Sequence, residues 1–170
     1  MPLRTLLKLG GLLLLVAGAV TLAALQFRSL GQTGDAGARV WFYDESAQRL
    51  YAAPADTIPP HKGTSGRSGD GVRAVVVTMP GHKQRVAYLE TYSPELKAVL
   101  EEVHKAHAAK RPFAGRVPAR DSDFFQTNTL VRRVDESVWH PSNSPEALAI
   151  QSEWRTWGGP GAPPPAISTP

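Results

Sequence analysis

The chain has 170 residues, of which 42% are hydrophobic and 20% are charged, a composition typical of a globular protein and not of a disordered one. It contains no cysteine, which excludes disulfides, thiolate nucleophiles and thiolate metal sites. The formal charge of +4 falls to about +2 when two basic residues near the N-terminus are set aside, and such a small surplus argues against a nucleic-acid partner.

The first predicted element is an apolar run from residue 9 to residue 27, between Lys8 and Arg28. Its roughly 19 residues would span roughly 28 Å as a helix, close to the hydrocarbon thickness of a bilayer. Arg4 and Lys8 precede the run while Arg28 follows alone, so we expect the N-terminus in the cytoplasm. This predicts a single-pass protein of the cytoplasmic (inner) membrane that contacts the lipid bilayer through residues 9–27, with residues 1–8 inside and the C-terminal domain exported.

A cleaved secretory signal is the alternative for this segment, with Ala17-Gly18-Ala19 as the cleavage site. The apolar run continues to Phe27, which is longer than the usual signal core of about 7 to 15 residues and favours an uncleaved signal anchor.

Behind the anchor, residues 28–38 carry three spaced glycines and predict a flexible linker. Residues 39–157 form one exported domain of about 119 residues, the commonest size for a single core. Residues 158–170 are rich in glycine and proline and predict a disordered tail.

The domain opens with strand patterns. Residues 39–54 place aromatic and β-branched residues on both sides of a short polar stretch, which predicts a β-hairpin. Residues 54–71 predict a long surface loop, mobile at its Gly/Ser-rich part. The unbroken run Val75-Val76-Val77 predicts a central strand over 72–79, covered on both faces, and 85–92 alternates as its partner.

Helices follow. Ser93-Pro94-Glu95 is a helix start, with a capping hydroxyl, proline at the first helical position and an acidic residue in the first turn. This helix should end near Lys110, before Pro112. Its buried face is predicted from the helical period to contain Leu96, Val99, Leu100, Val103 and His107.

The remaining elements are shorter. Residues 112–127 are irregular, with Phe124 and Phe125 expected to be buried, and 129–134 predicts a further strand. Ser144 opens a second, shorter helix that runs to about Trp154. The fold class is therefore α+β: a small antiparallel or mixed sheet of about five strands with one long packed helix, preceded by a single transmembrane helix.

Two tryptophans, Trp41 and Trp139, fall in strand patterns and are expected in the core. For Trp154 and Trp157 the alternatives are docking of the C-terminal helix, a membrane interface and a partner surface.

Motifs for catalysis are missing. The loop from Gly63 to Gly69 matches neither the nucleophile elbow nor the phosphate-binding loop, and no Ser/Lys dyad of the S-x-x-K type is present. Asp121-Ser122-Asp123 has the oxygen ligands of a divalent-cation site, but an acidic turn explains it as well. We assign no catalytic residue and expect no cofactor.

The candidate metal ligands are His104 and His107 on the long helix. They lie one helical turn apart, so both can face one transition-metal ion, with Glu101, His61 or His82 completing the site. The structural alternative has His107 packed on the buried face and bonded to the last carbonyls of the helix, with His104 at its solvent edge.

Four stretches carry a family resemblance: VWFYDESAQRLYAAPADTIPP, GVRAVVVTM, RVAYLETYSPELK and LVRRVDESVWHPSNSPEA. Together with the anchor, they resemble a group of uncharacterised membrane-anchored exported proteins of planctomycete-type bacteria. Relatives often carry a cysteine pair where this chain has Pro80-Gly81-His82-Lys83, so a redox or metal role tied to those cysteines is not available here. The resemblance implies an exported, membrane-tethered domain of unknown activity.

These observations predict a non-catalytic envelope binding or assembly protein with an envelope protein as partner. A metal-binding or hydrolytic module using the helix histidines is the alternative. A third hypothesis, a structural subunit that self-associates through its membrane helix, is supported by the small-residue pair Ala19-x-x-x-Ala23.

Overall fold

The computed structural model describes residues 37–79, 81, 83–159, 161 and 163–170. Residues 37–170 form one compact unit with an α+β fold. The predicted membrane helix over residues 9–27, its cleavage alternative and most of the linker lie outside the described residues. No helix within the described ranges is long and apolar enough to cross a bilayer.

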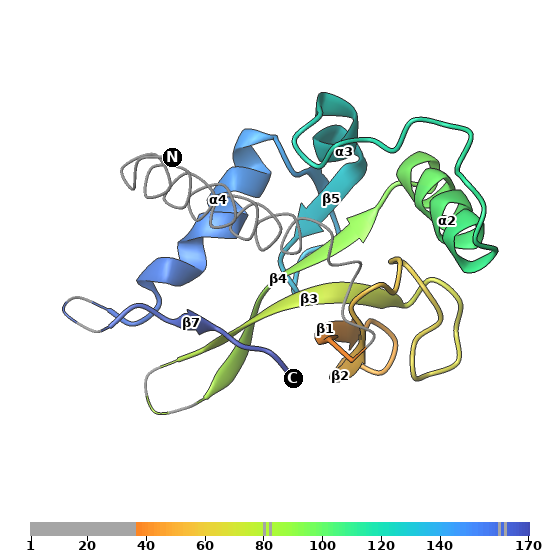
Figure 1. Cartoon of the computed structure of the whole chain (residues 1–170). Helices are drawn as coiled ribbons and strands as arrows, with labels where there is room; N and C mark the ends of the chain where they lie inside the picture. Colours follow the sequence, from red (N-terminus) through yellow and green to blue (C-terminus); the bar gives the residue numbers. More distant parts are fainter. Residues whose placement is uncertain (1–36, 80, 82, 160, 162) are drawn as a thin grey trace, which may run out of the picture. The chain divides into compact units, whose positions relative to one another are not determined.

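The centre of the unit is an antiparallel sheet of seven strands in the order β2-β1-β3-β4-β5-β6, with β7 paired to β3 (Figure 1). The strands are β1 (Arg39–Asp44), β2 (Arg49–Pro54), β3 (Gly71–Thr78), β4 (Gln84–Tyr92), β5 (Thr129–Arg132), β6 (His140–Pro141) and β7 (Ala166–Ile167). The hairpin, the central strand and its partner are thus confirmed. The sheet has more strands than expected because β6 and β7 are only two residues long, too short for a periodic pattern.

Both faces of the sheet are packed. On one face Val72, Val76 and Leu89 form a buried cluster against which Trp41 and Trp139 pack, as predicted. The other face is covered in part by helix α4 (Pro145–Glu153) and the short η1 (Trp154–Thr156). The buried Trp154 packs there with Val77 and Ala87, so it docks the C-terminal helix.

The two predicted helix starts are present. Helix α2 (Pro94–Ala108) is capped by Ser93, whose hydroxyl accepts from the N–H of Leu96, and α4 is capped in the same way by Ser144. A third helix, α3 (Asp123–Asn128), lies inside the segment predicted to be irregular. It spans six residues, which is too few turns to show a helical pattern.

The burial predicted for two phenylalanines is correct for one of them. Phe125 of α3 is half-buried and its ring lies edge-on to that of Tyr92, whereas Phe124 is 45% exposed. A short helix on the surface of the sheet presents only one side to it, so adjacent side chains cannot both be covered.

The long loop between β2 and β3 is held by Asp44 at the end of β1. The buried Asp44 carboxylate accepts from the N–H of Ala47 (2.9 Å), the hydroxyl of Thr64 (2.8 Å) and the N–H of Ser65 (2.6 Å). Burial alone would raise the pKa of Asp44, but these hydrogen bonds outweigh it and hold the pKa well below its usual value. The part of the loop predicted to be mobile is therefore tied to the sheet.

The C-terminal tail also differs from prediction. Instead of being wholly disordered, its Ala166 and Ile167 pair with β3, and the Ser168 N–H donates to the Val76 carbonyl (2.8 Å). Strand β1 pairs with only the first three residues of β3, Gly71 to Arg73. Along the rest of that edge, the backbone of the tail forms hydrogen bonds with some of the β3 backbone groups that β1 does not pair.

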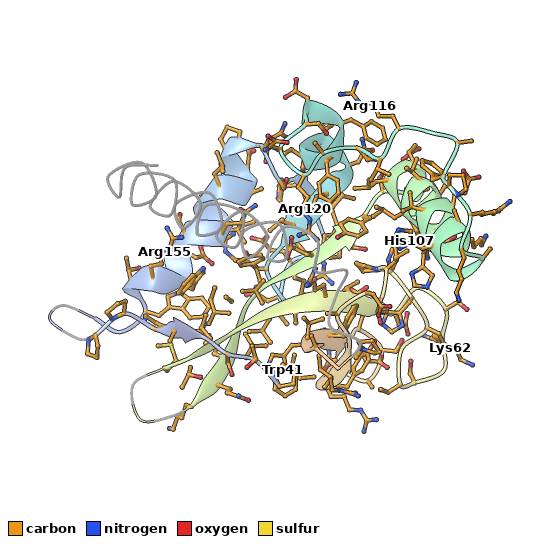
Figure 2. All side chains as sticks on the ribbon, in the orientation of Figure 1. Trp41, Lys62, His107, Arg116, Arg120 and Arg155 are labelled. Atoms are coloured by element: carbon orange, nitrogen blue, oxygen red, sulfur yellow. The ribbon has the colours of Figure 1, made fainter. Side chains whose placement is uncertain are left out.

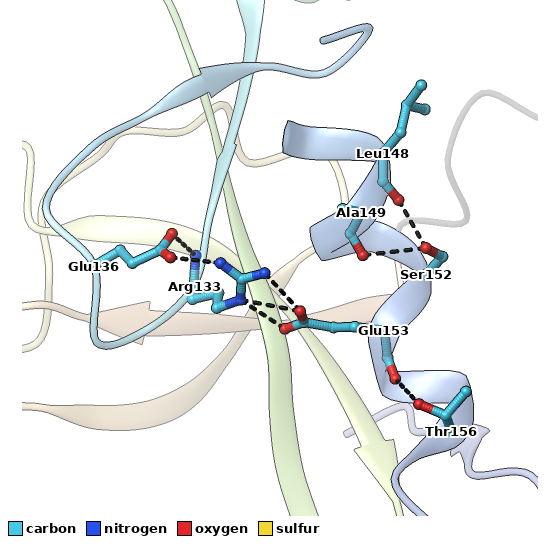
Figure 3. Close-up of polar contacts among 7 residues, drawn as sticks. All are labelled: Arg133, Glu136, Leu148, Ala149, Ser152, Glu153 and Thr156. Atoms are coloured by element: carbon cyan, nitrogen blue, oxygen red, sulfur yellow. Dashed lines mark hydrogen bonds and ion pairs between the residues drawn. The ribbon is translucent and has the colours of Figure 1, made fainter. Parts of the chain in front are cut away.

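An ion-pair network joins the segment after β5 to α4 (Figure 3). The guanidinium of Arg133 binds Glu153 through two nitrogens (2.8 and 2.6 Å) and also pairs with Glu136. These contacts, with the apolar packing of the helix, position α4 on the sheet.

Candidate functional site

A cavity of about 500 Å³ lies where α2, the segment 117–120 and the loop 55–58 meet the sheet. Its ionisable lining residues come from five parts of the chain: Asp56, Arg73, Tyr92, His104, His107 and Arg120. A second cavity of about 350 Å³ crosses β3 and β4 and reaches the C-terminal tail.

The two cavities adjoin, because Arg73, Tyr92, Arg120 and Phe125 line both of them. We call the combined space the groove. Residues of β3 and β4 line both of its parts. Helices α2 and α4 lie toward different ends of the sheet (Figure 1). Figure 2 shows His107 beside α2, Arg120 near the centre of the view and Arg116 at its upper edge.

Strand pairing places the central side chains of the groove. Arg73 of β3 lies directly opposite Glu90 of β4 in the register, and residues directly opposite in an antiparallel pair project to the same face. Tyr92 follows Glu90 at the strand period of two, so it lies on this face as well. Arg120 reaches the same place from the irregular segment before α3.

The electrostatics of the groove are set by its arginines and by one carboxyl group. Burial raises the pKa of Glu90, and the nearby Arg73 and Arg120 act in the opposite direction without cancelling the effect. Burial also raises the pKa of Tyr92, and it raises the pKa of Tyr88 to about 12, so both phenols stay protonated at neutral pH.

The arginines of the groove are not used in the ion pairs of the fold. Within the described part of the chain, ion pairs form at Lys97, Arg132 and Arg133, but not at Arg73 or Arg120. Two guanidinium groups therefore face the groove with donors that can take an anionic ligand.

The predicted metal ligands His104 and His107 both line the first cavity. His107 is exposed, and the prediction that it packs on the buried face is wrong. The buried residues of α2 are Leu96 near its start and Ala106 near its end, whereas His107, directly after Ala106, lines the cavity.

A complete metal site is not assembled from the described residues. No group of three potential ligands is found among them, and His82 lies outside the described ranges. Glu101 pairs with Lys97 (3.8 Å), and His61 is held within hydrogen-bond distance of the Tyr51 hydroxyl (3.0 Å) with its ring against Phe42.

The other sequence candidates have structural roles. Ser122 of the Asp-Ser-Asp motif caps α3, with Asp123 in the first helical turn, which fits the acidic-turn interpretation. In the Gly/Ser-rich loop, the Ser65 N–H donates to Asp44 and its hydroxyl contacts Asp70 (3.3 Å).

Sequence reasoning missed Arg73, Glu90, Tyr92 and Arg120. Arg73 was visible as the single charged residue of the apolar β3 strand, a pattern that indicates a charge facing the protein interior or a site. Glu90 gave a weaker signal, because β4 also contains Arg85. Arg120 had no such signal, because the segment around it has no regular pattern.

Comparison with protein family models, curated proteins and solved structures finds no match to this chain. No family is assigned. The resemblance drawn from sequence stretches stays a hypothesis, and the function is argued from the groove.

Proposed function

We propose that this chain is a membrane-tethered exported protein whose domain binds a protein partner of the bacterial envelope in the groove. The observation that carries the proposal is the pair of groove-facing arginines, Arg73 and Arg120, set in a cavity with apolar walls. A mostly apolar cavity with a few convergent polar groups is the usual form of a binding site.

The tether and the location rest on the sequence. The apolar run over residues 9–27 has the length of a bilayer span, and the basic residues before it favour a cytoplasmic N-terminus. In this proposal the domain faces the exported side of the inner membrane, where the absence of cysteine leaves it independent of disulfide formation.

Binding is favoured over catalysis by the chemistry of the arginines and phenols that line the groove. The groove phenols are protonated at neutral pH, and arginine is neither a base nor a nucleophile in that range. These groups donate hydrogen bonds and bind anions. Glu90, which is close enough to both arginines to feel their charge, modulates the local charge.

The alternative, a metal-binding or hydrolytic module, is supported by the shared cavity of His104 and His107. Metal analysis of the purified chain tests it directly. Bound metal that is lost in the double variant His104→Ala, His107→Ala would favour this alternative over the binding proposal.

The test of the binding proposal is affinity purification of the full chain in mild detergent, followed by mass spectrometry. A tag before Met1 leaves the C-terminal tail on β3 undisturbed, and separation of the tag from the domain would reveal signal cleavage. Arg120→Ala is compared with Arg116→Ala, which removes the same charge from the same segment at the outer edge of the molecule (Figure 2).

We expect one envelope protein to co-purify with the wild type and with Arg116→Ala, and to be lost with Arg120→Ala. An unchanged set of co-purifying proteins in all three samples would refute binding in the groove, as would recovery of the wild-type chain alone.

A further inference from the structure

We infer that the ligand of the groove is an extended peptide segment in which an acidic and an apolar residue are two positions apart, so that both side chains project to the same side. This inference rests on the proposed binding function and specifies its chemistry. The acidic side chain is held by Arg73 and Arg120, and the apolar side chain enters the cavity beside α2.

The charge of the groove selects an anionic group. Arg73 and Arg120 line both cavities, and His104 and His107 add further nitrogen donors at the α2 end. The opposing carboxylates are Asp56 in the first cavity and Glu90 in the second. Guanidinium groups match the planar carboxylate with paired hydrogen bonds, which is why arginine is the usual partner for this group.

The wall of the first cavity selects an apolar neighbour. Ile58 comes from the loop after β2, Leu100 and Val103 come from α2, and Val117 and Phe125 come from the segment that contains α3. These side chains surround the space next to the arginines. A ligand with a carboxylate alone would leave this apolar wall in contact with water.

The shape of the groove favours an extended chain. The first cavity has about 500 Å³ and the second about 350 Å³, and they meet at the arginines. In an extended peptide, the side chains of residues i and i+2 project to the same side, about 6.6 Å apart along the axis. A segment with an acidic and an apolar residue two positions apart can therefore present both groups to the adjoining compartments.

Glu90 is positioned to compete with the carboxylate of the ligand. It lies opposite Arg73 in the sheet, and its pKa is raised by burial while both arginines act on it. When ionised, Glu90 competes with a ligand carboxylate for the same guanidinium groups. Its conversion to glutamine removes that competition while keeping the shape of the side chain.

An acidic polysaccharide fits the groove less well. Such a polymer carries repeated negative charges and polar rings, and it calls for a continuous cationic strip or an exposed aromatic platform. Here only Arg73 and Arg120 lie at the junction of the two cavities, Arg39 lines the second cavity alone, and most of the apolar side chains of the compartment beside α2 are aliphatic, so the arginines do not form a continuous strip.

The experiment measures fluorescence anisotropy of labelled octapeptides with the full chain in nonionic detergent. The Leu-Glu probe repeats Leu-Ser-Glu-Ser, which puts leucine and glutamate two positions apart on one side of an extended chain. In the matched Leu-Gln probe, glutamine replaces glutamate, which keeps the shape and removes the charge. In the matched Ser-Glu probe, serine replaces leucine, which keeps the charge and removes the apolar side chain. Oligogalacturonate is included as a competitor to represent the polysaccharide source of carboxylates.

We expect the Leu-Glu peptide to bind about tenfold or more tightly than either matched peptide, from the loss of a charge-assisted pair or of apolar contact. Arg120→Ala should weaken its binding about tenfold, Arg116→Ala should leave it unchanged, and Glu90→Gln should strengthen it. General damage to the fold would weaken peptide binding in both Arg120→Ala and Glu90→Gln, so opposite effects of the two variants would exclude it.

Equal binding of the Leu-Glu and Leu-Gln peptides would overturn the inference, and so would equal effects of Arg120→Ala and Arg116→Ala. Tighter binding of oligogalacturonate than of any peptide would replace the peptide with a glycan. If an envelope protein co-purifies in an Arg120-dependent way but no acidic peptide binds, the ligand class is wrong and the binding function stands. If no protein co-purifies and no peptide binds, both the inferred ligand and the proposed binding function are refuted.

Discussion

Truncation of Ile150 tests whether this side chain holds α4 against the sheet. The same packing contacts Tyr88, which lines the groove. Ile150 is 1% exposed and forms a buried cluster with Val131 of β5 and Ala147, with Tyr88 packed against it. Leu148 lies on the same helix but is 56% exposed, so it provides a control of similar size.

The expected magnitude follows from the buried carbons. Ile150→Ala removes three carbons from a fully buried site, a transfer loss of about 2.4 kcal/mol at about 0.8 kcal/mol for each, before any cavity penalty. The better helix propensity of alanine offsets a few tenths of a kcal/mol of this loss. We expect a loss of about 3 kcal/mol, or roughly 10 °C in Tm for a domain of this size. Leu148→Ala should stay within about 0.5 kcal/mol of the wild type.

The assay is urea unfolding of the full chain in detergent, followed by tryptophan fluorescence. Trp154 is buried directly after α4, and its indole N–H donates to the Gln151 carbonyl (2.8 Å), so its emission reports on the docking of this helix. If Leu148→Ala lowers the free energy of unfolding as much as Ile150→Ala, the side of α4 that faces the sheet is assigned wrongly.

Two further predictions concern the ion-pair network and the loop held by β1. The hydrogen bond from Arg133 lowers the pKa of Glu136, so its stabilisation is present above about pH 4.5 and is lost as the pH falls below that value. The pair is about one-third exposed and screened by water, so Arg133→Gln should lower the free energy of unfolding by about 0.5–1 kcal/mol at neutral pH. Unfolding measured at several pH values should show this difference becoming smaller at low pH. An equal difference at all pH values would contradict this assignment. Gly63→Ala places a Cβ 2.6 Å from the Asp44 carboxylate, whereas Gly37→Ala meets nothing within 4 Å. Limited trypsin digestion should cut the loop faster in the first variant only, and equal rates in both would refute the anchoring of the loop by Asp44.

The sequence predicted best those elements whose signals are short-range. The starts of α2 and α4 were found because the hydroxyls of Ser93 and Ser144 accept from an N–H only three residues away, an interaction that needs no tertiary partner. The β1–β2 hairpin and the buried β3 strand were found for the same reason, since their pattern repeats within a few residues.

Short elements were missed because their stability comes from distant partners. β7 has two residues, one of them an isoleucine that is 66% exposed, and it is a strand only because an edge of β3 is open beside it. The six residues of α3 likewise form too short a helix to be stable alone, and Phe125 packs on Tyr92 of the sheet.

By itself, the sequence determined the composition limits, the lack of cysteine chemistry, the order of the main strands and helices, and the apolar run on which the membrane proposal rests. The tertiary structure alone decided where the groove lies. Arg73, Glu90 and Arg120 are far apart in the chain, and they meet because the register of β3 and β4 sets two of them opposite each other on one face. That register depends on the packing of both faces and on a bulge between Val75 and Val76, which are properties of the assembled sheet and not of any single stretch of residues.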